Sequence, residues 1–219
     1  MTETRSSQDL KGVEGETSSA RTIAWRGGEV ALGLMYEFIQ PGEILLDVGV
    51  GSGSSSVLFH RAGMSVWGMD VSEHALDACR ERGFAEALVQ HDLQQQPWPF
   101  ADGQFDHAVS LGVLNHFDSL DGVLAEFARV LGEKGRLCFT LEVQDADEAE
   151  AVSMRYTESA EQVQGDRRCR HYRHSDRYLR GLLADAGLVI RKQLRFVSDQ
   201  TLEGDDVSCT AFVVERSKR

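Results

Sequence analysis

Residues 45–53 read Leu-Leu-Asp-Val-Gly-Val-Gly-Ser-Gly, and this stretch decides the fold. The apolar run before Gly49 is short and bounded by turn residues, which is typical of a strand buried on both faces of a parallel sheet. Glycines at 49, 51 and 53 predict a tight turn that a ligand can approach closely, because glycine tolerates positive φ. Ser54–Ser56 and the apolar residues behind them predict a helix start, whose free N–H groups would face that ligand. The stretch therefore predicts a nucleotide-type binding turn.

Strand and helix patterns alternate along the chain. The last two strand patterns, joined by a polar connection, predict an antiparallel hairpin at the sheet edge. We therefore expect a doubly wound α/β fold, with a Rossmann-like sheet of seven strands that is mostly parallel, an antiparallel C-terminal edge strand and helices on both faces. Helices are predicted over residues 22–39, 57–61, 72–82, 120–131 and 177–186, and strands over 44–48, 64–69, 87–89, 105–111, 136–143, 188–197 and 207–215.

The chain is expected to form a single domain over residues 21–219. Residues 1–20 are rich in Ser, Thr, Glu and Gly, which predicts a disordered tail. Residues 142–174 are long for a connection between a strand and a helix, so we expect an insertion with a role of its own there.

Composition narrows the possible partners and compartment. The formal net charge is −12, from 35 acidic residues against 23 lysines and arginines, and such a field repels polyphosphates, so no nucleic-acid partner is expected. No apolar run approaches the roughly 20 residues that span a bilayer, and the N-terminus lacks the apolar segment of a signal peptide, which predicts a cytoplasmic protein without membrane contact. The four cysteines are scattered, so neither disulfides nor a metal site is expected.

The glycine turn alone fits NAD, FAD or S-adenosylmethionine, and its neighbours distinguish them. The dinucleotide fingerprint requires a third glycine at position 54, where this chain has Ser54. Asp47 lies two residues before the first glycine instead, and the glycines alternate. This spacing resembles motif I of the class I S-adenosylmethionine-dependent methyltransferases, and the resemblance extends from about Trp25 to the C-terminus.

The resemblance implies S-adenosylmethionine as cofactor and assigns residues to its parts. Asp70 closes the second strand, where the family accepts hydrogen bonds from both ribose hydroxyls; Asp92 follows the third, where the family meets the adenine amino group. Residues 97–136 are similar to the family's fourth-strand region, so Ser110 and Leu111 would line the methionine moiety. Trp25, and Tyr36 on the same predicted helix, could cover the pocket. The predicted cofactor-binding residues are Trp25, Asp47, Gly49, Gly51, Gly53, Asp70, Val71, Asp92, Leu93, Ser110 and Leu111.

The side that receives the methyl group carries weaker signals. Methyl transfer from a sulfonium depends mainly on proximity and orientation, and a general base is needed only where the acceptor carries a proton. His116, His171 and Tyr172 are the catalytic candidates, although His116 could instead pack a loop. In the family, insertions at the place of residues 142–174 cover the substrate, and the other contacts expected there are Tyr156, Arg170 and His174.

The arginines of residues 167–180 leave two interpretations open. They could bind an anionic or aromatic small-molecule acceptor, because arginine forks match carboxylate and phosphate. They could equally pair with the acidic run at 142–150 and brace the insertion. The run from His171 to Leu188 also resembles a narrower group of small methyltransferases similar to the human protein linked to the Williams–Beuren region, whose acceptors are poorly defined.

We therefore expect S-adenosylmethionine-dependent methyl transfer to an O or N nucleophile of a small molecule. A non-catalytic protein that binds S-adenosylmethionine or S-adenosylhomocysteine is the main alternative, since no base is mandatory. An NAD-dependent oxidoreductase is less favoured because of Ser54 and the edge hairpin. The sequence leaves monomer and homodimer equally open.

Overall fold

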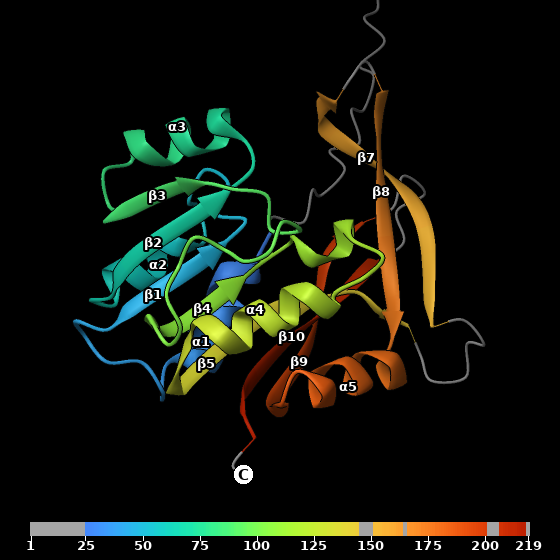
Figure 1. The fold of residues 1–219 in the computed structure, drawn as a ribbon. Helices are drawn as coiled ribbons and strands as arrows, with labels where there is room; N and C mark the ends of the chain where they lie inside the picture. The colour runs from blue at the N-terminus through green and yellow to red at the C-terminus, as the bar shows by residue number, and fades with distance from the viewer. Residues whose placement is uncertain (1–24, 145–150, 164–165, 201–205, 218–219) are drawn as a thin grey trace, which may run out of the picture.

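The structure is a computed structural model that describes residues 25–144, 151–163, 166–200 and 206–217. Its main sheet has seven strands (Figure 1). In their order across the sheet they are β3 (Ala87–Gln90), β2 (Ser65–Asp70), β1 (Ile44–Val48), β4 (Phe105–Ser110), β5 (Leu131–Leu141), β10 (Asp206–Arg216) and β9 (Leu188–Gln200). The first five strands are parallel, and β10 pairs antiparallel with both β5 and β9. The predicted fold class is thereby confirmed.

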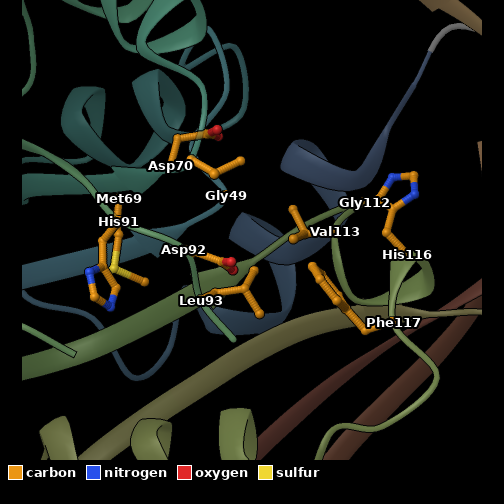
Figure 2. A pocket seen from close by; sticks show the side chains of 11 residues that line it. Gly49, Met69, Asp70, His91, Asp92, Leu93, Gly112, Val113, His116 and Phe117 are labelled. Atoms are coloured by element: carbon orange, nitrogen blue, oxygen red, sulfur yellow. The ribbon is translucent and has the colours of Figure 1, made fainter. Parts of the chain in front are cut away.

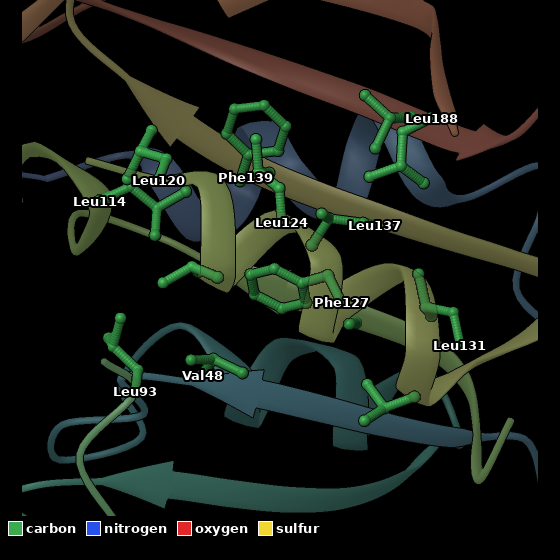
Figure 3. Packing of buried hydrophobic residues seen from close by; sticks show 14 of the residues in the cluster. Val48, Leu93, Leu114, Leu120, Leu124, Phe127, Leu131, Leu137, Phe139 and Leu188 are labelled. Carbon is green, nitrogen blue, oxygen red and sulfur yellow. The ribbon is translucent and has the colours of Figure 1, made fainter. Parts of the chain in front are cut away.

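Helices cover both faces of this sheet. On one face, α1 (Gly27–Met35), α2 (Ser56–Arg61) and α3 (Glu73–Glu81) pack on inward side chains such as Leu45 and Val109. On the other face, α4 (Asp121–Val130) and α5 (Asp176–Asp185) bury Phe127 and Leu183 against Leu46 and its neighbours. Figure 3 shows Leu124 and Phe127 of α4 in this cluster. Adjacent residues of β1 therefore serve opposite cores, which explains why this strand reads as an unbroken apolar run apart from Asp47.

Two helix starts are capped as their residue types predict. Ser72 precedes α3 and its hydroxyl accepts a hydrogen bond from the Ala75 N–H at 3.2 Å. Ser175 precedes α5 and accepts one from the Tyr178 N–H at 3.2 Å. Such caps satisfy N–H groups that the helix itself leaves free.

The first helix differs from its prediction. Apolar spacing predicted a helix over residues 22–39, whereas α1 begins at Gly27 and ends at Met35. Trp25 therefore precedes the helix, and Tyr36, which is 71% exposed, does not pack in the core. The predicted tail at residues 1–20 lies outside the described residues.

The predicted insertion contains a second sheet. Its strands, in order, are β6 (Val143–Gln144), β8 (Asp166–Ser175) and β7 (Val152–Val163), with β8 parallel to β6 and antiparallel to β7. These strands were not predicted from the sequence. β8 is polar and charged almost throughout, whereas Val152, Met154 and Tyr156 at the start of β7 alternate with polar residues, a strand signal that was missed. β8 contacts η1 (Leu114–His116), the short 3-10 helix that follows β4, so the second sheet stands beside the carboxyl edge of the main one (Figure 1).

Candidate functional site

The three glycines after β1 all have left-handed backbones, with φ of 78° at Gly49, 54° at Gly51 and 75° at Gly53. A Cβ at Gly49 would lie 2.4 Å from Cγ2 of Val113, and one at Gly53 would lie 2.7 Å from the Cys79 sulfur. A Cβ at Gly51 would meet nothing within 4 Å. Two glycines are thus required by protein packing, whereas Gly51 borders open space.

Asp70, the last residue of β2, ties the glycine turn to the start of α3. Its Oδ2 accepts a hydrogen bond from the Gly51 N–H at 2.8 Å, and its Oδ1 accepts one from the Ser72 N–H at 2.9 Å. An ionised carboxylate has about four acceptor positions, so each oxygen can still accept from a ligand hydroxyl. The arrangement holds the carboxylate in a fixed orientation at the edge of the sheet.

Asp47 lies behind the turn rather than in front of it. Its side chain is 3% exposed and accepts a hydrogen bond from the Ser56 hydroxyl at the start of α2. Burial raises the pKa of Asp47 to about 7, an effect that the Ser56 hydrogen bond partly offsets and the charge of Asp70 reinforces. Asp47 therefore braces the turn against α2.

A cavity of about 330 Å³ opens at the carboxyl ends of β1 to β4 (Figure 2). In open α/β sheets this is the edge at which ligands bind. The lining brings together six predicted residues: Gly49, Asp70, Val71, Asp92, Leu93 and His116. It also includes residues that the sequence analysis missed: Met69, His91, Gly112, Val113 and Phe117. Four of these residues lie within three positions of a strand end, which was the signal that could have found them; Phe117 follows η1 and carried no such signal.

Ser110 and Leu111 do not line this cavity, although both were predicted to contact the cofactor. The Ser110 side chain is fully buried, and its hydroxyl donates to the Val48 carbonyl at 2.9 Å. Leu111 packs into the core on the α1 face. Gly112 and Val113, immediately after them, occupy the predicted place, because β4 ends at Ser110 and the chain turns there.

Trp25 lies beside the glycine turn and outside the cavity lining. Its indole N–H donates to the Ser55 hydroxyl at 3.4 Å, and its ring lies 6.1 Å from that of Phe196 on β9. The same ring approaches Gly112, since a Cβ there would be 3.4 Å from it. Trp25 thus contacts the start of α2, β9 and the turn after β4. Gly51 and Gly53 belong to the glycine turn after β1 but do not line the cavity.

Two of the three catalytic candidates come together. The His116 ring on η1 lies 5.1 Å from the His171 ring on β8, with an interplanar angle of 76°. Burial lowers the pKa of His116, the charge of His171 lowers it further, and a hydrogen bond to the Arg170 backbone partly offsets both. His171 Nδ1 lies 2.9 Å from Oε1 of Glu142, a buried residue that the sequence analysis did not select.

The remaining candidates lie elsewhere. Successive side chains of a strand point to opposite faces, so Tyr172 faces away from the side of β8 that carries His171. Arg170 is exposed, and His174 is buried against Tyr178, with ring centroids 6.1 Å apart. The side chain of Tyr156 and most of the acidic run at 142–150 lie outside the described residues, so the bracing interpretation of the arginines stays a prediction.

Arg180 in the same cluster pairs with Asp176 on its own helix at 2.7 Å. Cys79, Cys138 and Cys209 are free and buried. Within the described part of the chain, no group of three or more His, Cys, Asp or Glu side chains is arranged to hold a metal ion. In that same part, no helix has the length and apolar character needed to cross a membrane.

Comparisons with known proteins find a methyltransferase domain in the part of the chain that contains the lining residues of this cavity. Residues 46–139 match a family model described as a methyltransferase domain. A demethylmenaquinone methyltransferase of Tropheryma whipplei is 34% identical over 99 residues, which are 45% of this chain and 41% of that protein. A malonyl-acyl-carrier-protein O-methyltransferase of Serratia marcescens is 32% identical over 126 residues, 58% of this chain and 48% of that protein. The matched stretches thus span less than half of these relatives.

A solved structure of an S-adenosylmethionine-dependent methyltransferase from Methanosarcina mazei has a similar fold. The TM-score is 0.68 at 19% identity, covering 85% of this chain and 98% of that one. This similarity shows a shared fold, and the match of residues 46–139 to a methyltransferase domain supports the class predicted from the glycine turn and its acids. The narrower resemblance to the Williams–Beuren-region group stays a prediction.

Proposed function

We propose that this chain, which carries a class I methyltransferase domain with S-adenosylmethionine as its cofactor, transfers the methyl group to an O or N nucleophile of a small molecule. The observation that supports this most is the cavity at the carboxyl edge of β1 to β4, which places Asp70 and Asp92 beside the glycine turn. The proposal includes release of S-adenosylhomocysteine as product.

The chemistry of the cavity suits the cofactor. Asp70 offers only acceptors, which match a pair of ribose hydroxyls, and Asp92 offers an acceptor for an adenine amino group. Leu93, Met69 and Phe117 supply apolar surface for a flat base. Gly51 leaves space beside Asp70 that any side chain would reduce. We therefore assign Asp70, Val71, Asp92, Leu93 and the glycine turn to cofactor binding.

S-adenosylmethionine, when bound, supplies a methyl group on a positively charged sulfur that leaves as a neutral thioether. Holding an acceptor in line with such a group contributes up to roughly 7–11 kcal/mol, so orientation supplies most of the catalysis. His116 lines the cavity, and its lowered pKa leaves it neutral near pH 7, the form that accepts a proton. We assign it the role of general base, with His171 beside it.

The acceptor is a small molecule in this proposal. Two of the relatives described above are named for demethylmenaquinone and for a malonyl-acyl-carrier protein as methyl acceptors. The acidic balance of this chain disfavours polyphosphate acceptors. An aromatic or anionic acceptor fits the histidines and arginines of residues 167–180, and monomer and homodimer remain alternatives to be measured.

Binding of the cofactor is tested by titration calorimetry. We expect Asp70→Ala to weaken S-adenosylmethionine binding about tenfold or more, because two charge-assisted hydrogen bonds are lost. Asp106→Ala is the matched control: its carboxylate also accepts a backbone N–H, from Ile44 at 2.8 Å, but at the opposite edge of the sheet. Equal affinity in the two variants would refute the ribose assignment.

Turnover is tested by S-adenosylhomocysteine release with a panel of phenols, carboxylic acids and amines. Release that never exceeds the blank, in a protein that S-adenosylmethionine stabilises against heat, would identify a non-catalytic binder. Stabilisation by NAD and not by S-adenosylmethionine would instead favour an oxidoreductase.

A further inference from the structure

A buried carboxylate contacts His171, one of the two histidines proposed for the site of the methyl acceptor. Glu142 follows the last residue of β5 and is 5% exposed. Its Oε1 lies 2.9 Å from Nδ1 of His171, whose side chain is 17% exposed. Burying a carboxylate is costly unless it is paired and hydrogen-bonded, so the contact with His171 is a principal reason why Glu142 is tolerated there.

This contact determines which nitrogen of His171 carries the proton. An ionised carboxylate can only accept a hydrogen bond, so Nδ1 of His171 must donate. In the neutral imidazole Nε2 then has a free lone pair, the form that can take up a proton. A charge on the imidazole would be compensated by Glu142 at hydrogen-bonding distance.

The same glutamate is tied to the element that carries His116. The Glu142 N–H donates to Oδ1 of Asn115 at 2.8 Å, and Asn115 is 4% exposed and precedes His116 on η1. The Glu142 carbonyl accepts from the His174 N–H at 3.2 Å, which fixes β8. Backbone and side chain of one residue thus hold both histidines, 55 positions apart in sequence, in contact with each other.

We propose that Glu142 is a positioning residue that holds His116 and His171 as a pair able to take up one proton from the methyl acceptor. This rests on the proposed methyl transfer. The acceptor lone pair forms the bond to the methyl carbon, the carbon–sulfur bond breaks with its electrons on sulfur, and the acceptor proton moves to the imidazole pair. The acceptor atom therefore carries a proton at neutral pH, which indicates a hydroxyl or an N–H rather than a carboxylate.

Other titratable and charged groups lie around the pair. Asp70, His91 and Asp92 line the same cavity as His116. Arg170 and Arg173 lie next to His171 along β8, Asp118 acts on His174, and Glu142 acts on Cys209 of β10. A comparison of variants that leaves all of these unchanged isolates the effect of Glu142.

The test is a pH titration of the histidine rings by long-range ¹H–¹⁵N NMR on the full chain, with signals assigned through His116→Gln and His171→Gln. In the wild type at pH 7.5 we expect the His171 proton on Nδ1. In Glu142→Gln we expect the pair to take up its first proton at a pH lower by about 1 or more, because a nearby opposite charge is removed.

Glu43→Gln is the matched control. Glu43 also pairs with a buried histidine, His107 at 3.1 Å, but at the amino edge of the sheet. It should change the titration of His107 and leave the His116–His171 pair unaltered. A His171 proton on Nε2 in the wild type, which needs no variant to fold, would overturn the proposal, as would equal titration of the pair in the two Gln variants. If the wild type does not bind S-adenosylmethionine, the proposed function is contradicted. The ring signals can still be measured in that case, so failure of the proposed function and failure of the Glu142 proposal are distinguishable.

Discussion

Gly49 and Gly51 lie two residues apart in one turn, yet replacement by alanine should mainly destabilise the fold at Gly49 and mainly weaken cofactor binding at Gly51. An alanine with positive φ costs roughly 1–2 kcal/mol in backbone strain, and both positions carry this cost. At Gly49 the new Cβ would also lie 2.4 Å from Val113, inside a packed region. Overpacking of this kind typically adds about 1–3 kcal/mol.

We therefore expect Gly49→Ala to lower the free energy of unfolding by about 2–5 kcal/mol. Gly51→Ala should lower it by only about 1–2 kcal/mol, because its Cβ meets nothing within 4 Å. That Cβ enters the space beside Asp70, so Gly51→Ala should raise the Kd for S-adenosylmethionine about tenfold or more. This corresponds to a loss of about 1.4 kcal/mol of binding free energy.

Urea denaturation measures the first effect and calorimetry the second. Gly42→Ala is the control, since Gly42 has φ of 92°, open space around it and a position between α1 and β1, away from the cavity. It should match Gly51→Ala in stability and the wild type in cofactor affinity. The reasoning fails if Gly51→Ala binds the cofactor normally, or if it loses more stability than Gly49→Ala.

Three further predictions concern stability. The raised pKa of Asp47, about 7 against 3.8 when unfolded, means that the folded state holds a proton that the unfolded state releases between about pH 4 and 7. Stability should thus fall as pH rises through that window, by roughly 4 kcal/mol in all, of which about 3 kcal/mol is lost between pH 5 and 8. Urea denaturation at these two pH values should show this contribution in the wild type and not in Asp47→Asn. Burial lowers the pKa of His174 below its usual 6.5, so stability should fall as pH drops below 6.5, and His174→Phe should reduce this acid loss in thermal unfolding; an identical acid limb in both proteins would contradict it. Arg129 donates to the carbonyls of Trp98 and Phe100 at 3.1 and 2.7 Å and to Glu126 at 2.7 Å, so Arg129→Ala should cost about 2–4 kcal/mol, against less than about 1 kcal/mol for the exposed Arg80→Ala.

The part of the site proposed to bind the methyl donor could be predicted because each of its residues lies at the end of a strand that the local sequence identifies. Each parallel strand ends in a turn at the same edge of the sheet, so Asp70 after β2 and Asp92 after β3 had to lie near the glycine turn once the strands were recognised. Ser110 and Leu111 were placed at the cavity from the sequence, but β4 ends at Ser110 and Gly112 and Val113 line the cavity instead, a difference of two residues in register.

The acceptor side could not be predicted in the same way, because non-local contacts build it. His116 and His171 were both selected for their residue type, but their proximity follows from β8 packing on η1, and β8 carries no alternating apolar pattern. Glu142 was read as one member of an acidic run, which is usually solvated. Its burial depends on contacts with Asn115 and His171, both of which lie far from it in sequence, and no local sequence pattern indicates such contacts.

The residues proposed for the methyl donor and those proposed for the methyl acceptor come from different parts of the chain, so the matched relatives give little information about the acceptor. The family match ends at residue 139, three residues before Glu142, and so includes the glycine turn, Asp70, Asp92 and His116 but neither Glu142 nor β8. The matched part therefore contains the glycine turn, Asp70 and Asp92, which we propose bind the methyl donor. Because the partners of His116 come from the segment that follows the match, a protein that shares residues 46–139 and replaces this segment would bind the same donor and select its acceptor differently. The Glu142–His171 pair, rather than the glycine turn, is where the acceptor specificity of this chain should be sought.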